Sequence, residues 1–309
     1  MPSDMISSSP ISNTQSVYLV VLSGLGFHHE MTKNKVLTQA LQDFIDFVWG
    51  GSRFCDDERS RQVARILILG NSLHEDRLAR DNEDDVDDSS ENDNIALRMK
   101  QSRQVKQYSR TISAVKHMDD FFAQLSKTIN VDVMPGPSDP SSHLLPQQPF
   151  HPCMFPKSCM YSTFNCVTNP HHAIYNDTVE LLATAGQNVD IIRKFSDLQD
   201  PIDIMKHHLK WGNSAPSAPD NLYSVPYEDE DPYVIDFIPD IYIAGCQDSY
   251  SSDYHCHTSS KSSQSACYDN QPAAPKSRTL LVTVPKFYES FSCVLIDLVS
   301  KIPQVLSFK

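Results

Sequence analysis

The sequence predicts an α/β fold in which buried strands alternate with amphipathic helices. Two observations lead to this prediction. In the first half, three short apolar runs are separated by segments with helical periodicity, the order expected of a parallel sheet with right-handed crossovers. In the second half, apolar runs follow one another with a single clear helix between them. With 309 residues, 40% of them hydrophobic, the chain is long enough to bury a large core.

The first predicted strand covers residues 17–22 and is apolar throughout, as expected of a strand buried on both faces. It ends at the turn sequence 23–26, which contains two glycines. The next segment predicts a helix that ends near the glycine pair at 50–51. Its apolar face consists of Leu37, Leu41, Phe44, Ile45 and Val48.

Two further strands and a second helix complete the first half. The strands are predicted at 64–69 and 131–134, and each ends at a turn that contains a glycine, Gly70 or Gly136. The helix between them is predicted from one apolar face, formed by Ile112, Val115, Met118, Phe122 and Leu125.

The second half is predicted to be rich in strands. One helix interrupts it, with Asp200 as the N-cap, Pro201 in the first turn and Gly212 at the end. Residues 247–277 are polar and predict a long surface loop. The predicted strands cover residues 163–167, 178–184, 242–244, 280–284 and 293–298.

Charge is distributed unevenly along the chain. The formal net charge is −13, and residues 75–93 hold ten acidic residues and two arginines, so −5 remains for the rest. We therefore expect residues 75–95 to form an acidic, disordered insert and residues 1–16 a disordered leader. This balance argues against a free-standing nucleic-acid binder. No signal peptide or membrane span is recognisable, so free thiols in a reducing, intracellular compartment are expected.

Glycine and polar residues gather at four predicted strand ends, where open α/β sheets place their functional groups. These loops are 23–25, 70–74, 136–139 and 245–247. Their order and glycine placement resemble the calcineurin-like metallophosphoesterases. Enzymes of that family carry D-x-H, G-D-x-x-D, G-N-H-[DE] and G-H-x-H at these points, and the side chains hold two metal ions.

The sequence departs from those motifs at nearly every ligand position. An amide, a hydroxyl and one carboxylate cannot hold two divalent cations. We therefore expect a degenerate metal site, no cofactor, and no catalytic or metal-binding residues. Ser23 and Leu25 replace the first Asp and His, Asn71 the bridging Asp, Pro137 and Ser138 the Asn and His, and Cys246 a His, whereas Asp139 remains.

A second resemblance is more specific. The segment 131–156, VDVMPGPSDPSSHLLPQQPFHPCMFP, resembles the signature of the DNA polymerase delta small (B) subunits. The resemblance extends from about residue 17 to the C-terminus. Further matching pieces lie at 22–26, 168–170, 186–191, 217–220 and 281–285.

This resemblance implies an inactive calcineurin-like phosphoesterase domain over residues 17–309, built from two packed mixed β-sheets flanked by helices. It implies a nuclear, non-catalytic scaffold subunit of the polymerase delta holoenzyme in DNA replication and repair. Such a protein binds the C-terminal module of the catalytic subunit and contacts DNA at most indirectly. In this family an oligonucleotide-binding barrel precedes the first strand, whereas only residues 1–16 precede it here. We therefore expect the barrel to be absent, which weakens the expectation of binding to the third polymerase subunit.

Three other interpretations stay open. An active phosphodiesterase or nuclease would need the metal ligands that are missing at positions 23, 25, 71, 138 and 246. A B-subunit of polymerase alpha or epsilon would share the fold, but the run 145–149 favours delta. An incomplete chain would expose apolar surface and misfold. The prolines of residues 146–156 predict an extended ribbon that packs on the domain or a partner, or a rigid crossover between the two halves.

Overall fold

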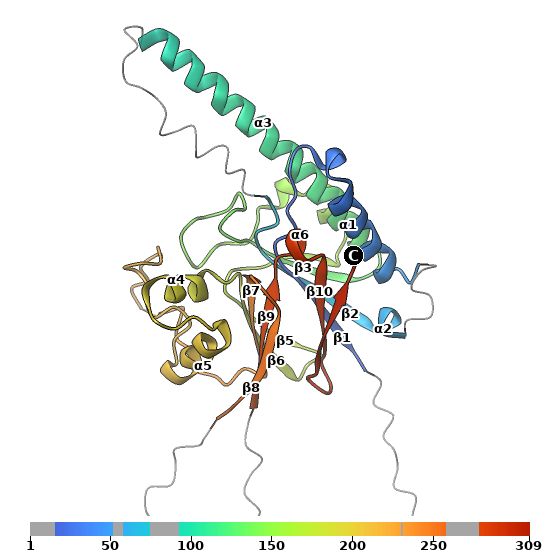
Figure 1. Ribbon diagram of the computed structural model, residues 1–309, viewed down its shortest axis with the longest axis vertical. Coiled ribbons are helices and arrows are strands. Elements are labelled where there is room, and N and C mark those ends of the chain that lie inside the picture. Colours follow the sequence, from blue (N-terminus) through green and yellow to red (C-terminus); the bar gives the residue numbers. More distant parts are fainter. Residues whose placement is uncertain (1–15, 52–57, 75–92, 230, 258–277) are drawn as a thin grey trace, which may run out of the picture.

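The computed structural model describes residues 16–51, 58–74, 93–229, 231–257 and 278–309. These residues form two mixed β-sheets that pack face to face, with helices on the outer faces (Figure 1). The six-stranded sheet has the order β11-β10-β1-β2-β3-β4, and the five-stranded sheet the order β5-β6-β7-β9-β8. The prediction of two mixed sheets flanked by helices is therefore confirmed.

The six-stranded sheet contains the three strands predicted in the first half of the chain. β1 (Tyr18–Leu22), β2 (Val63–Leu69), β3 (Asn130–Met134) and β4 (Phe164–Cys166) run parallel to one another. β10 (Ser292–Asp297) returns antiparallel beside β1, and β11 (Pro303–Ser307) pairs with β10 at the edge.

The five-stranded sheet comes entirely from the second half. Its centre is parallel and consists of β6 (Val179–Thr184), β7 (Ile241–Gln247) and β9 (Arg278–Pro285). An antiparallel strand closes each edge, β5 (His171–Tyr175) beside β6 and β8 (Ser251–Cys256) beside β9.

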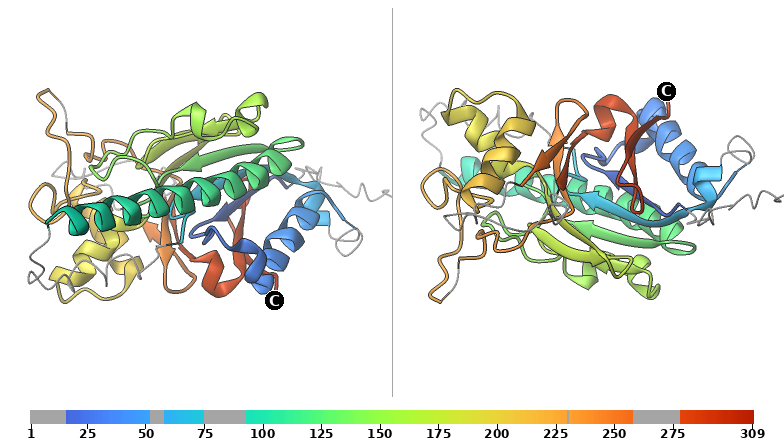
Figure 2. Two further views of the ribbon diagram at one scale, coloured as in Figure 1. Left: turned by 90° about the horizontal axis from the view of Figure 1, so that it is seen from above. Right: turned by 90° about the horizontal axis from the view of Figure 1, so that it is seen from below.

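Helices cover the two outer faces. α1 (Lys35–Val48) and the C-terminal half of α3 (Asp93–Ser126) pack on the six-stranded sheet through a phenylalanine-rich core. α4 (Gln187–Phe195) and α5 (Pro201–Trp211) cover the five-stranded sheet. Figure 2 shows α1 on the opposite side of the sheets from α4 and α5. Short helices α2 (Glu58–Arg61) and α6 (Phe287–Ser290) and the 3-10 turns η1 (Met31–Lys33), η3 (Pro152–Met154) and η4 (Ser158–Met160) lie in the connections.

The period of two along each strand explains why the predicted strands are continuously apolar. In β1, Val20 and Leu22 belong to the core under α1 and α3, whereas Leu19 and Val21 belong to the core between the sheets. Both faces are buried, so polar residues have no place on this strand.

Several details differ from the prediction. The polar segment 247–277 is predicted to be a loop, but its part 251–256 is the edge strand β8, whose side chains are mostly exposed. α3 begins at Asp93, within the expected insert 75–95, and Ile112 is 56% exposed instead of packed on the predicted face. The sequence does not predict helix α4 or strands β5 and β11. Three parts of these expectations lie outside the described residues, namely 1–15 of the expected leader 1–16, 75–92 of the expected insert 75–95 and 258–277 of the expected loop 247–277. Among the described helices, none is both long and apolar enough to span a membrane.

Candidate functional site

The four glycine-containing loops meet at one place, where the carboxyl ends of both sheets come together. The Gly24 amide donates to the Gly70 carbonyl at 3.0 Å, which joins the first two loops. A Cβ atom on Gly245 would lie 2.7 Å from the Cβ of Leu69, so the fourth loop touches the end of β2. We call the side chains gathered here, Ser23, Asn71, Ser138, Asp139 and Cys246, the strand-end centre.

Ser23 and Cys246 are buried and bonded to neighbouring strands. The Ser23 hydroxyl lies 3.1 Å from the carbonyl oxygens of both Val284 and Pro285, and its oxygen accepts the Cys246 amide at 2.9 Å. The Cys246 thiol lies 3.6 Å from the Leu69 carbonyl oxygen. Burial raises the pKa of this thiol to about 12, so it is protonated at neutral pH.

Asp139 joins two of the loops. One carboxyl oxygen accepts the Leu73 amide at 2.9 Å, and the other accepts the Gly136 amide at 2.9 Å. Its side chain is buried, with only 2% of the residue exposed. Burial raises the pKa of Asp139 to about 7, although the backbone amides oppose the rise. The one carboxyl group that remains from the metal-binding motifs therefore accepts hydrogen bonds from backbone amides of its own loops.

Asn71 and Ser138 are half-buried and bonded to each other. The Asn71 side-chain oxygen accepts the Ser138 amide at 3.0 Å and lies 3.0 Å from the Ser138 hydroxyl. That hydroxyl is also 2.9 Å from the carbonyl oxygen of Leu73. Asn71 has a φ of 51°, a left-handed conformation that Asn tolerates better than most residues.

Backbone packing closes the centre. A Cβ atom on Gly136 would lie 2.3 Å from the Asn71 amide nitrogen, so only glycine fits between these loops. Each polar side chain of the strand-end centre is already bonded to backbone or to another member. In the part of the chain that the structure describes, no group of three or more His, Cys, Asp or Glu residues could hold a metal ion.

Two further strand ends reach the same place and are not among the predicted loops. Lys286, directly after β9, pairs with Ser23 in an isolated bridge. Gly186, two residues after β6, has a φ of 94°, and a Cβ there would lie 2.2 Å from the Gly245 carbonyl oxygen. Both follow predicted apolar runs, so the glycine-or-proline signal used for the other loops could have found them.

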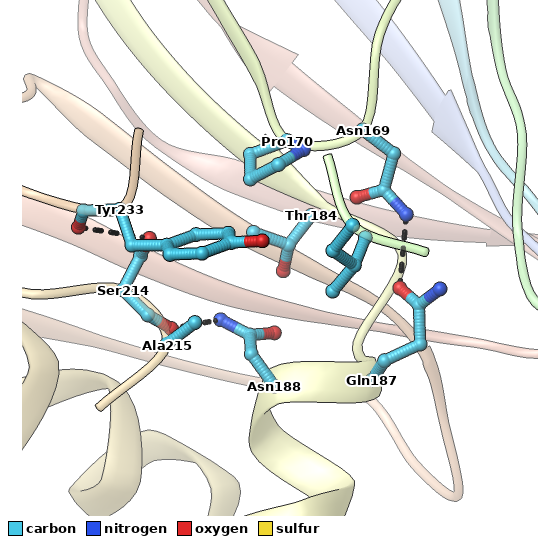
Figure 3. A pocket seen from close by; sticks show the side chains of 9 residues that line it. Asn169, Pro170, Thr184, Gln187, Asn188, Ser214, Ala215 and Tyr233 are labelled. Atoms are coloured by element: carbon cyan, nitrogen blue, oxygen red, sulfur yellow. Dashed lines mark hydrogen bonds between the residues drawn. The ribbon is translucent and has the colours of Figure 1, made fainter. Parts of the chain in front are cut away.

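The proline-rich ribbon packs on its own domain beside the strand-end centre. Gln147, only 1% exposed, exchanges backbone hydrogen bonds with Asn169 at 2.7 and 3.1 Å. The Asn169 side-chain amide then donates to Gln147 at 2.7 Å and to Gln187 at 2.9 Å. Figure 3 shows the last of these bonds at the rim of a small pocket. The ribbon therefore joins the end of β3 to the start of α4.

Comparisons with known proteins identify relatives over most of the chain. The model of the DNA polymerase alpha/epsilon B-subunit family matches residues 19–252. The DNA polymerase delta small subunit of Oryza sativa is 30% identical over 303 residues, which cover 96% of this chain and 60% of that protein. DNA polymerase delta subunit 2 of Drosophila melanogaster is 30% identical over 92% of this chain and 57% of its own length. The small subunit of Arabidopsis thaliana is 30% identical over 97% of this chain and 59% of its own length. The chain thus spans about 60% of the Oryza sativa relative.

Proposed function

Because this chain belongs to the DNA polymerase alpha/epsilon B-subunit family, we propose that it is a non-catalytic accessory subunit of the DNA polymerase delta holoenzyme. The choice of delta is supported by the similar proteins from rice, fly and Arabidopsis, all of which are named as delta subunits. In this proposal the two-sheet body has the fold of an inactive calcineurin-like phosphoesterase, and the subunit acts in the nucleus in DNA replication and repair.

The observation that carries the non-catalytic part is the closure of the strand-end centre by its own chain. Ser23 bonds to β9, Asp139 is occupied by two backbone amides, and Asn71 is occupied by Ser138. A two-metal phosphoesterase needs several anionic or imidazole ligands directed at open space. The residues present do not fit two divalent cations, so the site is a degenerate one and supports no metal-dependent step.

The proposed partner is the C-terminal module of the delta catalytic subunit. A rigid two-sheet body with a closed centre suits a scaffold, because pre-ordered surfaces lose little entropy on binding. The net charge of −13 disfavours direct contact with the DNA backbone, so DNA is contacted through the partner.

The test of the scaffold role is a titration of the full chain with the purified C-terminal module of the delta catalytic subunit from the same organism. We expect binding with a Kd below roughly 1 μM, which corresponds to about −8 kcal/mol. The corresponding module of the alpha catalytic subunit is the control and should bind at least tenfold more weakly. Equal binding to both modules would refute the assignment to delta.

The same preparation tests the non-catalytic role. With Mn²⁺ and a chromogenic phosphodiester we expect no turnover above a buffer blank. Turnover that is abolished by Asp139→Asn but unaffected by Asp203→Asn would contradict the degenerate site. Asp203 is a matched control because its carboxylate is half-exposed on α5, outside the strand-end centre.

A further inference from the structure

A small pocket lies beside the strand-end centre, at the start of α4. It is bounded by the end of β6, the cis peptide Asn169-Pro170, the first turn of α4 and the segment 214–215, with Tyr233 across it. The N-cap of α4 is Gly186, which offers no side chain to the free amides of the first turn. Figure 3 shows the Tyr233 ring crossing the pocket with its hydroxyl directed toward Thr184.

Three buried side chains at this pocket have a polar atom without a partner. Thr184, Asn188 and Tyr233 are 2%, 5% and 5% exposed. The Thr184 hydroxyl, the Asn188 side-chain oxygen and the Tyr233 hydroxyl have no hydrogen-bond partner among the described residues. A buried polar group left in this condition costs about 1–3 kcal/mol. Three such atoms at one pocket therefore indicate that something polar joins them.

The orientation of the Asn188 side chain determines whether the missing polar group must donate or accept a hydrogen bond. Its side-chain nitrogen donates to the Ser214 carbonyl at 2.7 Å and lies 3.1 Å from the Tyr242 hydroxyl. The carboxamide cannot turn over without facing its oxygen toward the Ser214 carbonyl, so the oxygen stays directed into the pocket. The missing group must donate to this oxygen, which excludes a halide or other anion.

The size of the pocket sets the second condition. The volume open to the centre of a water molecule is about 10 Å³, which is close to what one molecule needs. A nucleotide, sugar or peptide side chain does not fit. A monovalent cation would require more oxygen ligands than these two side chains and one phenol provide.

We propose that a single water molecule is a built-in part of this domain, held between the Thr184 hydroxyl and the Asn188 side-chain oxygen. It donates to Asn188 and exchanges a hydrogen bond with Thr184, so it links the end of β6 to the first turn of α4. The inference is independent of the proposed role in the polymerase.

The substitution Thr184→Val tests the proposal by the sign of its effect, because valine has the shape of threonine without the hydroxyl. If the water is present, the variant leaves it short of a partner, and the midpoint of urea unfolding falls by roughly 0.3 M. If the pocket is dry, the variant removes an unsatisfied hydroxyl, and the midpoint rises or stays level. Ser126→Ala is the control, since the buried Ser126 hydroxyl also has no partner among the described residues but does not line the pocket. Its midpoint should not fall in parallel.

A crystal structure of the unmodified full chain gives an independent answer if the variant does not fold. We expect one density peak within about 2.7–3.2 Å of both the Thr184 hydroxyl and the Asn188 oxygen. An absent peak would overturn the proposal. So would an anomalous signal there after a bromide soak, or a peak with five or more oxygen neighbours, because these results identify an anion or a cation.

Discussion

At the scale of single residues, Asp139 couples the strand-end centre to pH. Its pKa of about 7 in the folded chain lies above the ordinary value of 3.8. Between these values the folded chain binds more protons than the unfolded chain, so the free energy of unfolding falls as the pH rises. The stability that this group contributes is complete below about pH 4 and is lost as the pH passes through 7.

We therefore expect Asp139 to produce a measurable pH dependence of stability. The free energy of unfolding of the unmodified chain should exceed that of Asp139→Asn most at low pH. The difference should shrink by up to about 1.4 kcal/mol per pH unit between pH 4 and 7. Urea titrations of both proteins at several pH values measure this difference. A constant difference across that range would show that the Asp139 pKa is not raised.

Gly136 gives a second prediction at this scale. A methyl group there would lie 2.3 Å from the Asn71 amide nitrogen, a backbone atom that cannot rotate out of the way as a side chain can. Gly136→Ala should lower the free energy of unfolding by about 2 kcal/mol or more. Gly212→Ala is the comparison, because Gly212 has a φ of 65° but its nearest neighbour would be 3.7 Å away. That variant meets backbone strain alone and should cost about 1 kcal/mol. A Gly136→Ala variant less damaging than Gly212→Ala would contradict the close loop packing.

At the scale of elements, the two sheets are joined by a polar cluster away from the strand-end centre. Asp132 of β3 accepts hydrogen bonds from Arg65 of β2 at 2.8–2.9 Å and from the Tyr175 hydroxyl of β5 at 2.8 Å. The Arg65 guanidinium also lies 5.1 Å from the centre of the Tyr175 ring. β5 is an edge strand of the five-stranded sheet, so this cluster fastens that edge to the interior strands β2 and β3 of the six-stranded sheet.

Removal of the Tyr175 hydroxyl should loosen this connection. Tyr175→Phe should lower the free energy of unfolding by about 1.5–3 kcal/mol, because it deletes a buried hydrogen bond to a charged group. Tyr254→Phe is the matched control, since its hydroxyl bonds to the Lys301 carbonyl at an exposed position. The control should change stability by less than about 0.5 kcal/mol. Chemical denaturation measures the free energy of unfolding of both variants. Equal losses would mean that the hydrogen bond from Tyr175 to Asp132 contributes no more stability than the exposed one of Tyr254.

The elements also show which parts of the fold can be predicted from the sequence. The sequence predicts β1, β2, β3, β6, β7, β9 and β10 because strands with two buried faces are continuously apolar. It also predicts the short edge strand β4, from the apolar run at 163–167. It does not reveal the edge strands β5, β8 and β11, because one of their faces meets solvent and their ladder depends on backbone pairing. It does not reveal α4 either, because the mean polarity of that helix is high and its N-cap is a glycine instead of a side-chain acceptor.

The sequence predicts where in the fold the candidate site lies, but it does not predict the hydrogen bonds that hold the site together. Glycines at strand ends locate the four loops, and the structure brings them together. The resemblance to the delta small subunits is confirmed by the comparisons. The bonds of Ser23 to β9 and of Asp139 to Leu73 depend on contacts between residues 66 to 262 positions apart. Such contacts leave no periodic signal in a single sequence.

At the scale of the whole molecule, the sheets share one apolar layer and should unfold together. Leu19 and Val294 of the six-stranded sheet and Leu181 and Val282 of the five-stranded sheet belong to that layer. The chain has two tryptophans, Trp49 directly after α1 and Trp211 at the end of α5. They therefore report on opposite sides of the molecule.

We expect the single-tryptophan variants Trp49→Phe and Trp211→Phe to show coincident transitions. In each variant the midpoint of urea unfolding by fluorescence should equal the midpoint by far-ultraviolet circular dichroism. Coincidence follows if loss of the shared layer leaves neither sheet with a complete core. If the fluorescence midpoint precedes the circular dichroism midpoint in only one variant, the side of the molecule that carries the remaining tryptophan of that variant unfolds first.

The two ends of the long helix α3 should differ in how fast their amide hydrogens exchange with solvent. Its 34 residues extend about 51 Å, and Figure 1 shows its N-terminal part projecting beyond the sheets. Tyr108 and Ile112 are 69% and 56% exposed, whereas Met118 and Phe122 are fully buried. A helix without a packed face opens readily, because it relies on intrinsic propensity alone. Amide hydrogens before Ile112 should therefore exchange with deuterium at least about 100-fold faster than those after Met118, in a single continuous helix.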